Sequence, residues 1–367
     1  MATYYVRKTG NDGNAGTSAG AAKLTLNGAE DIPLVAGDVV VVGSGVYRES
    51  LTVDVSGSAG NPITYIGDYT GALTGDAKGV VRITGSADDI ALTRASCITG
   101  SSKNYRTFRG FRMDLTSSHP VSLTTCDHWI IEQCHITRAT GGTNGCIDGN
   151  HLNTNHIFRN CFFDTTGSGV TFGTSAADNS GNLIESCVIL CNAYGVSYGV
   201  FMWGVGGTTV RNCTIIGATI GGIRGLGMNV GQTITVNNNI VYGCATAFAS
   251  DSTARFTEDY NTISACGTAR SNVTAGGNSV TRPPLWDTRW FFEAVNGGRL
   301  ITPFDLASYS TLVELNSGTG APSTDLRGTA VQGTYREWGA SEYDSTLKIA
   351  AGGGLLRSPG MGGGIDS

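Results

Sequence analysis

The chain has 367 residues, of which 54 are glycine, about 15% and roughly twice the average usage, while charged residues make up only 14%. Hydrophobic residues at 40% exclude intrinsic disorder, and only eight prolines without a Gly-X-Y period exclude collagen. The net charge is −5 and the basic residues are scattered, so we expect no nucleic-acid partner. No apolar run is as long as a membrane-spanning helix, so we expect no membrane partner either.

The N-terminal sequence, Met1 to Gly10, lacks a basic stretch followed by an apolar stretch. We therefore expect no signal peptide, and folding in a cytoplasm. Ten cysteines in such a chain do not suggest a disulfide framework, and no Cys-x-x-Cys pair with zinc spacing is present. The cysteines need another explanation.

Six segments between residues 105 and 241 align without gaps at a spacing of about 25 residues. Alternate positions within each segment are apolar and β-branched residues are frequent, so the segments are predicted to be short strands. Short strands that repeat at this spacing, with Gly and Asn turns between them, predict an all-β parallel solenoid whose coils stack on one another. We expect Ile131, Cys134 and Ile136 to face its interior.

One column of this alignment explains four of the cysteines. It contains Phe111, Cys134, Cys161, Cys187, Cys213, Asn239 and, more weakly, Tyr260. Because cysteine is among the most buried residue types, we interpret the four as stacked interior side chains with free thiols. Disulfides and metal ligation are the alternatives.

Two neighbouring columns predict a corner and a charge ladder. The column one residue earlier holds residues that tolerate left-handed backbone, and so predicts a stacked corner: Gly110, Gln133, Asn160, Ser186, Asn212, Asn238 and Asp259. The column two residues earlier alternates in charge through its first five members: Arg109, Glu132, Arg159, Glu185, Arg211, Asn237 and Glu258. We therefore interpret Glu132 and Glu185 as ladder residues and not as a catalytic carboxylate pair.

Both ends of the chain carry further motifs. The first 70 residues contain Tyr4-Tyr-Val-Arg-Lys-Thr-Gly-Asn-Asp-Gly, Ala36-Gly-Asp-Val-Val-Val-Val and Gly57-Ser-Ala-Gly-Asn-Pro-Ile-Thr-Tyr-Ile-Gly, and later come Pro303-Phe-Asp-Leu and Trp338-Gly-Ala-Ser-Glu-Tyr. These motifs resemble the right-handed parallel β-helix, pectate-lyase-like superfamily over residues 4 to 343. The resemblance implies a short N-terminal cap (1–37), a right-handed parallel β-helix (38–280), an irregular C-terminal closing segment (281–347) and a glycine-rich tail arm (348–367).

This superfamily contains lyases, hydrolases, epimerases and non-enzymatic spikes, so the fold does not fix an activity. A member without a signal peptide is most similar to bacteriophage virion proteins, which are usually trimeric. This resemblance implies a homotrimeric surface protein of a virion, bound to capsid or tail proteins, that stabilises the particle or binds a surface polysaccharide. A cap that begins at residue 4 favours a head decoration protein or short spike over a full tailspike. The alternative is a polysaccharide lyase or glycoside hydrolase.

Candidate catalytic residues are few. The motifs of pectate lyases and polygalacturonases are missing, and no lysine occurs between Lys103 and Lys348. The nearest constellation is Asp127, His128, His135, Asp148, His151, His156 and Asp164. Glycosidases need two carboxyls about 5 to 9.5 Å apart, so Asp148, Asp164 and His151 are the catalytic candidates. No histidine spacing converges on a metal, so no cofactor is expected, and Asp88-Asp89 is interpreted as a solvated turn.

A second candidate site is aromatic. If the Gly-Val and Gly-Ile segments at 169, 199 and 222 align, Phe172, Met202 and Gly225 share a column. Four residues then lie near one another on adjacent coils: Tyr198, Phe201, Trp203 and Arg224. Aromatic faces beside an arginine are typical of a glycan-binding platform. Packing in the core or against a partner subunit is the alternative.

Two sets of apolar residues are candidates for an oligomer interface. Ile130, Ile157 and Leu183 each precede a position expected to be buried, so they should point outward as a strip that another chain covers. In the tail, the apolar side chains of Leu355, Leu356 and Met361 predict an extended arm that docks on a neighbouring subunit. A frayed terminus is the alternative for the tail.

Overall fold

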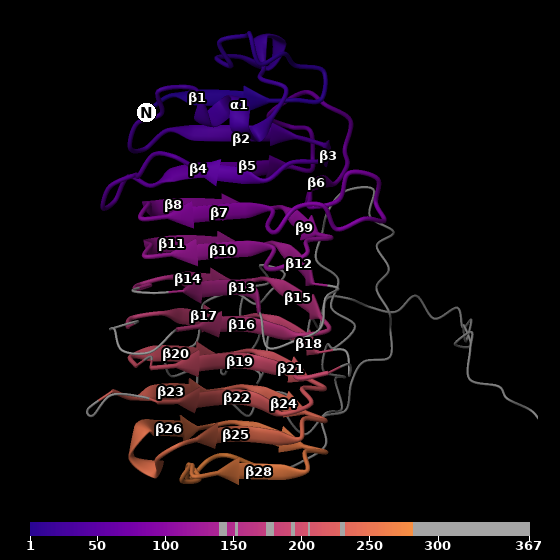
Figure 1. Cartoon of the computed structure of the whole chain (residues 1–367). Helices are drawn as coiled ribbons and strands as arrows, with labels where there is room; N and C mark the ends of the chain where they lie inside the picture. The colour runs from indigo at the N-terminus through magenta and orange to yellow at the C-terminus, as the bar shows by residue number, and fades with distance from the viewer. Residues whose placement is uncertain are drawn as a thin grey trace, which may run out of the picture.

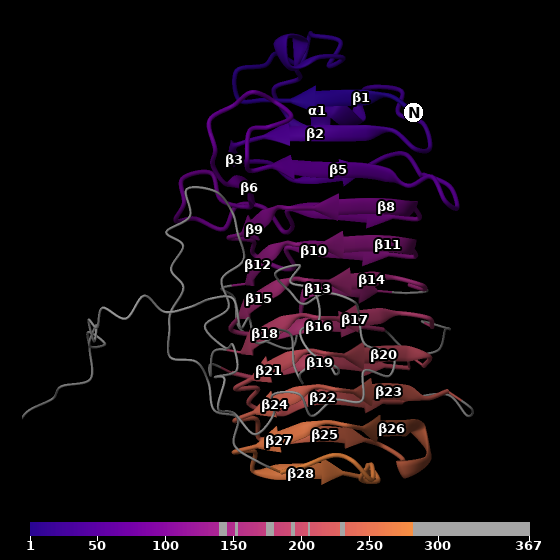
Figure 2. The same cartoon turned by 180° about the vertical axis from the view of Figure 1, so that it is seen from behind.

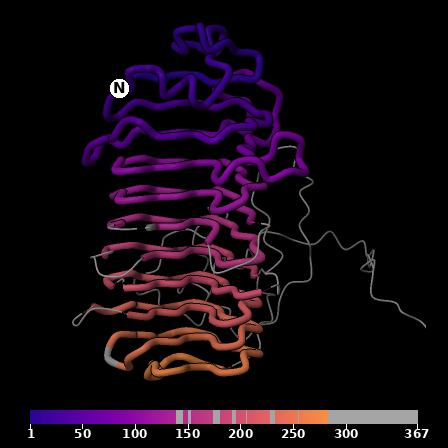
Figure 3. Tube along the Cα trace, viewed as in Figure 1, coloured from indigo at the N-terminus to yellow at the C-terminus, as the bar shows by residue number. Residues whose placement is uncertain are grey.

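A computed structural model of the chain shows stacked coils built from three parallel β-sheets (Figure 1, Figure 2). The structure describes residues 1–281 except 139–144, 151–152, 174–179, 192–194, 205 and 228–231. Successive strands run through three sheets in turn, called sheets A, B and C, and the chain then continues into the next coil, which lies lower in Figure 3. The predicted all-β parallel solenoid is confirmed.

The strands of each sheet follow one another in spatial order. Sheet A contains β1 (Thr3–Val6), β2 (Val39–Gly43), β5 (Ile63–Asp68), β8 (Asn104–Arg109), β11 (Asp127–Glu132), β14 (Ile157–Arg159), β17 (Leu183–Glu185), β20 (Thr208–Arg211), β23 (Ile234–Asn237) and β26 (Phe256–Asp259). Sheet B contains β3 (Gly45–Tyr47), β6 (Val81–Thr84), β9 (Arg112–Asp114), β12 (His135–Arg138), β15 (Phe162–Thr165), β18 (Val188–Cys191), β21 (Thr214–Ile216), β24 (Ile240–Tyr242) and β27 (Thr262–Ser264). Sheet C contains β4 (Leu51–Val53), β7 (Ile98–Ser101), β10 (Val121–Thr124), β13 (Gly145–Asn150), β16 (Ser168–Phe172), β19 (Tyr198–Trp203), β22 (Gly221–Leu226), β25 (Thr246–Ser250) and β28 (Thr268–Ser271). The helical elements are η1 (Ala19–Ala21), α1 (Leu26–Glu30) and η2 (Thr253–Arg255).

The interior column is built as the alignment predicts. Ile131 and Ile136 are fully buried, and so are the four stacked cysteines at 134, 161, 187 and 213. All ten cysteines are free thiols. Strand pairing in sheet A confirms the column from Phe111 to Asn239. Small apolar side chains therefore fill the space between the sheets at this corner.

The last member of the column is predicted wrongly. Pairing of β23 with β26 places Asn261, and not Tyr260, beside Asn239. The backbone N–H of Asn239 donates to Asn261 Oδ1 at 2.9 Å, and its Nδ2 donates to the same oxygen at 3.0 Å. A buried amide that replaces a cysteine needs a polar partner on the next coil, and Asn261 supplies it.

The corner between sheets A and B has left-handed backbone, as predicted. The first six positions of the column, Gly110 to Asn238, have positive φ angles, which range from 50° at Ser186 to 82° at Gly110. Because the last coil is shifted by one residue, the final member is Tyr260, with φ of 54°, and not Asp259. Glu258 likewise leaves the charge column, where Asp259 lies beside Asn237.

The charge ladder lies on the outer face of sheet A. Arg159 Nη2 is 2.7 Å from Glu132 Oε2, and Arg211 Nη2 is 2.7 Å from Glu185 Oε2. Arg109 approaches Glu132 from the other side at 3.9 Å. Both carboxylates are therefore held by arginines of neighbouring coils, which supports their interpretation as ladder residues.

The predicted apolar strip also lies on the outer face of sheet A. Ile130, Ile157 and Leu183 are in register on successive strands and are half-buried. Their outward direction is confirmed, while their coverage by another chain stays a prediction. Residues 282–347 of the closing segment and the whole tail arm, with Leu355, Leu356 and Met361, lie outside the described residues.

A buried ion pair attaches the N-terminal cap to the coils. The guanidinium of Arg106 on β8 is fully buried, pairs with Glu30 of α1 and donates from Nη1 to Val55 O at 2.9 Å. Tyr65 on β5 donates its hydroxyl to Glu30 Oε1 at 2.6 Å, and its ring lies 5.3 Å from the guanidinium. The cap helix is thereby held over the open interior of the first coils.

Replacing Arg106 by alanine should leave Glu30 buried without its cation. We expect a loss of about 3–5 kcal/mol in the free energy of unfolding, as is typical when one partner of a buried pair is removed. The matched control is Arg109→Ala, which removes an exposed arginine of the same strand and should cost only ~0–1 kcal/mol. Urea unfolding of both variants measures the difference, and equal losses would contradict the role given to Arg106.

Candidate functional site

Three glycines in one column lie at the start of strands of sheet C, where the chain comes from sheet B. A Cβ atom at Gly169, Gly199 or Gly222 would lie 2.5, 2.4 or 2.7 Å from the side chains of Ile189, Ile215 and Val241, in that order. Only glycine therefore lets β16, β19 and β22 begin so close to the interior side chains of sheet B. The predicted column of Phe172, Met202 and Gly225 is confirmed by the pairing of β16, β19 and β22.

This register brings the predicted aromatic residues together. The rings of Tyr198 and Phe201 stack with centroids 4.6 Å apart, and Phe201 meets Trp203 edge-on at 6.2 Å. Arg224, on the next coil, lies 5.6 Å from the Tyr198 ring, and its Nη1 donates to the Tyr198 hydroxyl at 3.3 Å. The four residues therefore form one cluster, which we call the aromatic cluster.

The cluster is open to solvent on one side. Trp203 is 45% exposed, Phe201 and Arg224 are half-buried, and Tyr198 is buried beneath them. Among the described residues Arg224 has no carboxylate partner, and its Nε has no hydrogen-bond acceptor. The alternative of packing in the core is therefore wrong for Phe201 and Trp203. The arrangement places ring faces and a half-buried guanidinium side by side.

The same outward column of sheet C contains a candidate catalytic carboxylate. Moving along the coils, the column runs through Ser122, Asp148, Thr171, Phe201 and Arg224. Asp148 is only 8% exposed and accepts a hydrogen bond from Thr171 Oγ1 at 2.7 Å. Asp148 and the aromatic cluster therefore belong to one face of the molecule.

His119 pairs with Asp148 and was not selected from the sequence. Its Nε2 lies 3.5 Å from Asp148 Oδ2, and its Nδ1 lies 3.1 Å from Gly145 O. A carbonyl oxygen only accepts, so Nδ1 carries a proton and Nε2 faces the carboxylate. Burial lowers the pKa of the nearby Arg138 guanidinium, and the Asp148 carboxylate opposes that shift. His119 and Asp148 therefore form an imidazole–carboxylate contact beside sheet C.

The other members of the predicted constellation do not join this pair. Asp164 lies on sheet B opposite Thr137, whereas Asp127 on sheet A contacts His128 and accepts from Thr154 Oγ1 at 2.6 Å. His151 lies outside the described residues. The sequence spacing placed these residues on neighbouring coils but could not separate the three sheets.

Two histidines of the constellation have structural surroundings. His156 is fully buried, stacks near Phe158 and accepts the backbone N–H of Trp129 at 3.0 Å. Burial lowers its pKa to about 3. His135, on the outer face of sheet B, has its pKa lowered to about 4 by burial and by Arg112. His156 is therefore a hydrogen-bonded interior residue and not a ligand.

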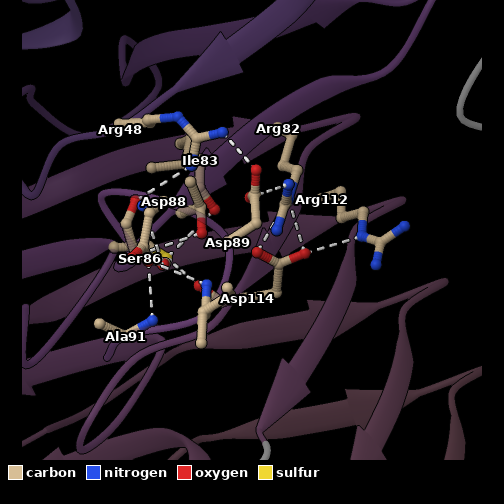
Figure 4. Close-up of polar contacts among 12 residues, drawn as sticks. Arg48, Arg82, Ile83, Ser86, Asp88, Asp89, Ala91, Arg112 and Asp114 are labelled. Carbon is tan, nitrogen blue, oxygen red and sulfur yellow. Dashed lines mark hydrogen bonds and ion pairs between the residues drawn. The ribbon is translucent and has the colours of Figure 1, made fainter. Parts of the chain in front are cut away.

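The Asp88-Asp89 turn is exposed to solvent, as predicted, and Asp89 also takes part in ion pairs. Asp89 pairs with Arg48 and Arg82 (Figure 4). The hydrogen bond from Arg48, with a smaller effect of Arg82, lowers the pKa of the Asp89 carboxyl to about 2. Buried Asp114 accepts from Arg82 Nε and Arg112 Nε, each at 2.9 Å. Three arginines face three aspartates in this cluster, so it holds the loop 85–96 and carries no excess charge for a ligand.

Neither a metal centre nor a membrane segment is found in the part of the chain that the structure describes. No group of three or more His, Cys, Asp and Glu side chains there is placed to hold a metal ion. No described helix is long and apolar enough to span a membrane.

Comparison with known proteins identifies the fold. No protein-family model and no curated protein matches the chain. Pectate lyase Pel9A is 14% identical with a TM-score of 0.54, covering 94% of this chain and 97% of that one. XylC in complex with xylose is also 14% identical with a TM-score of 0.54, covering 76% of this chain and 66% of that one. A glycoside hydrolase is 11% identical with a TM-score of 0.52, covering 72% and 88%. The chain thus has the right-handed, pectate-lyase-like parallel β-helix fold, and at these identities the likeness concerns the fold alone.

The buried neutral state of His156 predicts a pH dependence of stability. Its pKa of about 3 lies below the ordinary 6.5, so the unfolded chain binds a proton that the folded chain does not. The free energy of unfolding should therefore fall as the pH is lowered from about 6.5 toward 3. NMR titration of the ring resonance that disappears in His156→Gln checks this, and a midpoint near 6.5 in the folded protein would contradict it.

Proposed function

We propose that the protein binds a polysaccharide along the outer face of sheet C. The observation that carries the proposal is the aromatic cluster, in which the exposed ring of Trp203 and the half-buried ring of Phe201 lie next to Arg224. The Arg224 guanidinium has no carboxylate partner among the described residues. The apolar faces of sugars stack on such rings, and arginine donates to hydroxyl or carboxylate oxygens. An exposed aromatic patch on a monomer commonly marks a binding site.

The rest of the column suits an extended sugar chain. Thr171, Asp148 and Ser122 continue it with hydrogen-bonding groups at one residue per coil. Coils are about 4.8 Å apart, which is close to the length of one sugar unit in a polysaccharide. A chain that lies along the axis of the β-helix would therefore run from the aromatic cluster over the buried Thr171 and Asp148 toward the half-buried Ser122.

The similar solved structures give this proposal general support, because they include a pectate lyase and a protein in complex with xylose. A place on a phage particle, as a homotrimer attached to capsid or tail proteins, stays a prediction from the resemblance. Binding of a host surface polysaccharide by sheet C would serve such a protein as well as it would serve an enzyme.

Removing the cluster should weaken binding. We expect Trp203→Ala, Phe201→Ala and Arg224→Ala each to weaken binding by roughly tenfold or more, as truncation of central aromatic and arginine contacts commonly does. Affinity electrophoresis in gels that contain acidic or neutral polysaccharides measures this. Ile90→Ala and Arg109→Ala are the controls, because they remove an exposed apolar and an exposed basic side chain outside sheet C. Binding that all variants retain would refute the proposed site.

Cleavage of the bound chain is a second candidate function, favoured by the His119–Asp148 pair. A buried carboxylate beside a histidine can act as general base or acid when a sugar is bound over it. Asp148 lies in the same column as Phe201, two coils away, and His119 contacts it, so a chain held by the aromatic cluster would extend across the pair.

Asp148→Asn tests this second function without changing the shape of the side chain. If the pair is catalytic, the variant should lose the release of reducing ends or unsaturated products while it still binds polysaccharide. Asp164→Asn, on sheet B, is the control and should keep the activity. No turnover by the wild-type chain, or full turnover by Asp148→Asn, would exclude catalysis at this pair.

A further inference from the structure

One cysteine in the last coils differs from the other nine in its exposure to solvent. Nine of the ten thiols are buried, and Cys266 is the one that is partly open to solvent. It follows β27, at the corner where sheet B turns into sheet C. Thiol reagents in solution should therefore reach Cys266 first.

Strand pairing places Cys244 next to Cys266. Tyr242 on β24 pairs with Ser264 on β27, and each cysteine follows two residues later. The parallel hydrogen bonds continue past both cysteines, since Gly267 N donates to Cys244 O at 3.1 Å and Thr268 N donates to Ala245 O at 2.8 Å. The Cα atoms of residues stacked on neighbouring coils are about 4.8 Å apart, which is within the range of Cα–Cα separations found in disulfides.

Both thiols lie beside backbone carbonyls at this corner, and Cys244 Sγ is 3.6 Å from Tyr242 O. Cys266 Sγ lies 3.7 Å from Val241 O, a carbonyl of the coil that carries Cys244, and 3.4 Å from Ser264 O. The strand register makes Cys244 the neighbour of Cys266 on the preceding coil. The neighbouring Cys244 thiol lowers the pKa of Cys266, whereas burial raises the pKa of interior thiols such as Cys97 and Cys146 to about 12. The reactive thiolate form therefore belongs to the more exposed partner.

We propose that Cys266 and Cys244 form a thiol–disulfide exchange pair, in which Cys266 reacts with a small disulfide and Cys244 resolves the product. The Cys266 thiolate attacks one sulfur of glutathione disulfide and displaces a glutathione thiolate. Cys244 then gives its proton to solvent and attacks Cys266 Sγ, and the second glutathione thiolate leaves. Two protein thiols are oxidised, and one glutathione disulfide is reduced to two thiols.

The crosslink would join β24 and β27 in the last coils that the structure describes. The stacked cysteines at 134, 161, 187 and 213 are also neighbours, but their full burial keeps disulfide reagents away. The site depends on exposure at one end of the β-helix and is independent of glycan binding on sheet C.

Peptide mapping by mass spectrometry after treatment of the full chain with glutathione disulfide tests the proposal. We expect the wild-type chain to lose about 2 Da in one peptide pair that contains Cys244 and Cys266. Cys244→Ser should instead accumulate a single glutathione adduct on Cys266, and Cys266→Ser should stay unmodified. Cys213→Ala, which removes an interior thiol, should react as the wild type does.

Three results would overturn the proposal. They are a stable glutathione adduct on wild-type Cys266, first modification of any other cysteine, and no reaction of the native chain under conditions in which the unfolded chain reacts. Circular dichroism spectra of the variants show whether each keeps the β-fold, and the result for the wild-type chain decides the question even if a variant unfolds.

Discussion

The parallel backbone hydrogen bonds between successive coils determine almost every other feature of this protein. They place one residue of each coil directly over its counterpart in the next, at the interstrand spacing of about 4.8 Å. A side chain that suits one coil must therefore suit its neighbours, and columns of like function result. Buried cysteines, left-handed corners, alternating charges and the corner glycines are four such columns. The outward column of sheet C is a fifth, and its residues differ from coil to coil because no common interior packing determines them.

A stack of coils has two ends at which the ladder of hydrogen bonds stops, and buried carboxylates organise both ends of the described part. At the N-terminal end Glu30 of the cap helix binds Arg106 and Tyr65. At the other end Glu258 accepts from Arg270 Nε at 2.6 Å and from Asn261 Nδ2 at 2.8 Å. These charges are expensive to bury alone, so each pair makes the arrangement of its end specific.

The sequence predicts the coils well where a column has a distinctive residue. The cysteines and the glycines at 169, 199 and 222 are such markers, and the aromatic cluster follows from the second set. Prediction fails where the marker changes. Asn261 was missed because the last coil exchanges cysteine for an amide pair, and His119 was missed because Pro120 and Cys146 occupy the glycine column there. The partners of Asp89 come from β-strand and loop contacts that no repeat encodes.

The central claim is that stacking order turns separate residues into one carbohydrate-binding face on sheet C. A crystal structure of the full chain with a bound oligosaccharide tests it most directly. We expect sugar rings over Trp203 and Phe201, with Arg224 within hydrogen-bonding distance of the sugar. The bound oligosaccharide should extend along the coils toward Asp148. Sugar bound on another sheet, or a second subunit packed over the aromatic cluster, would contradict it.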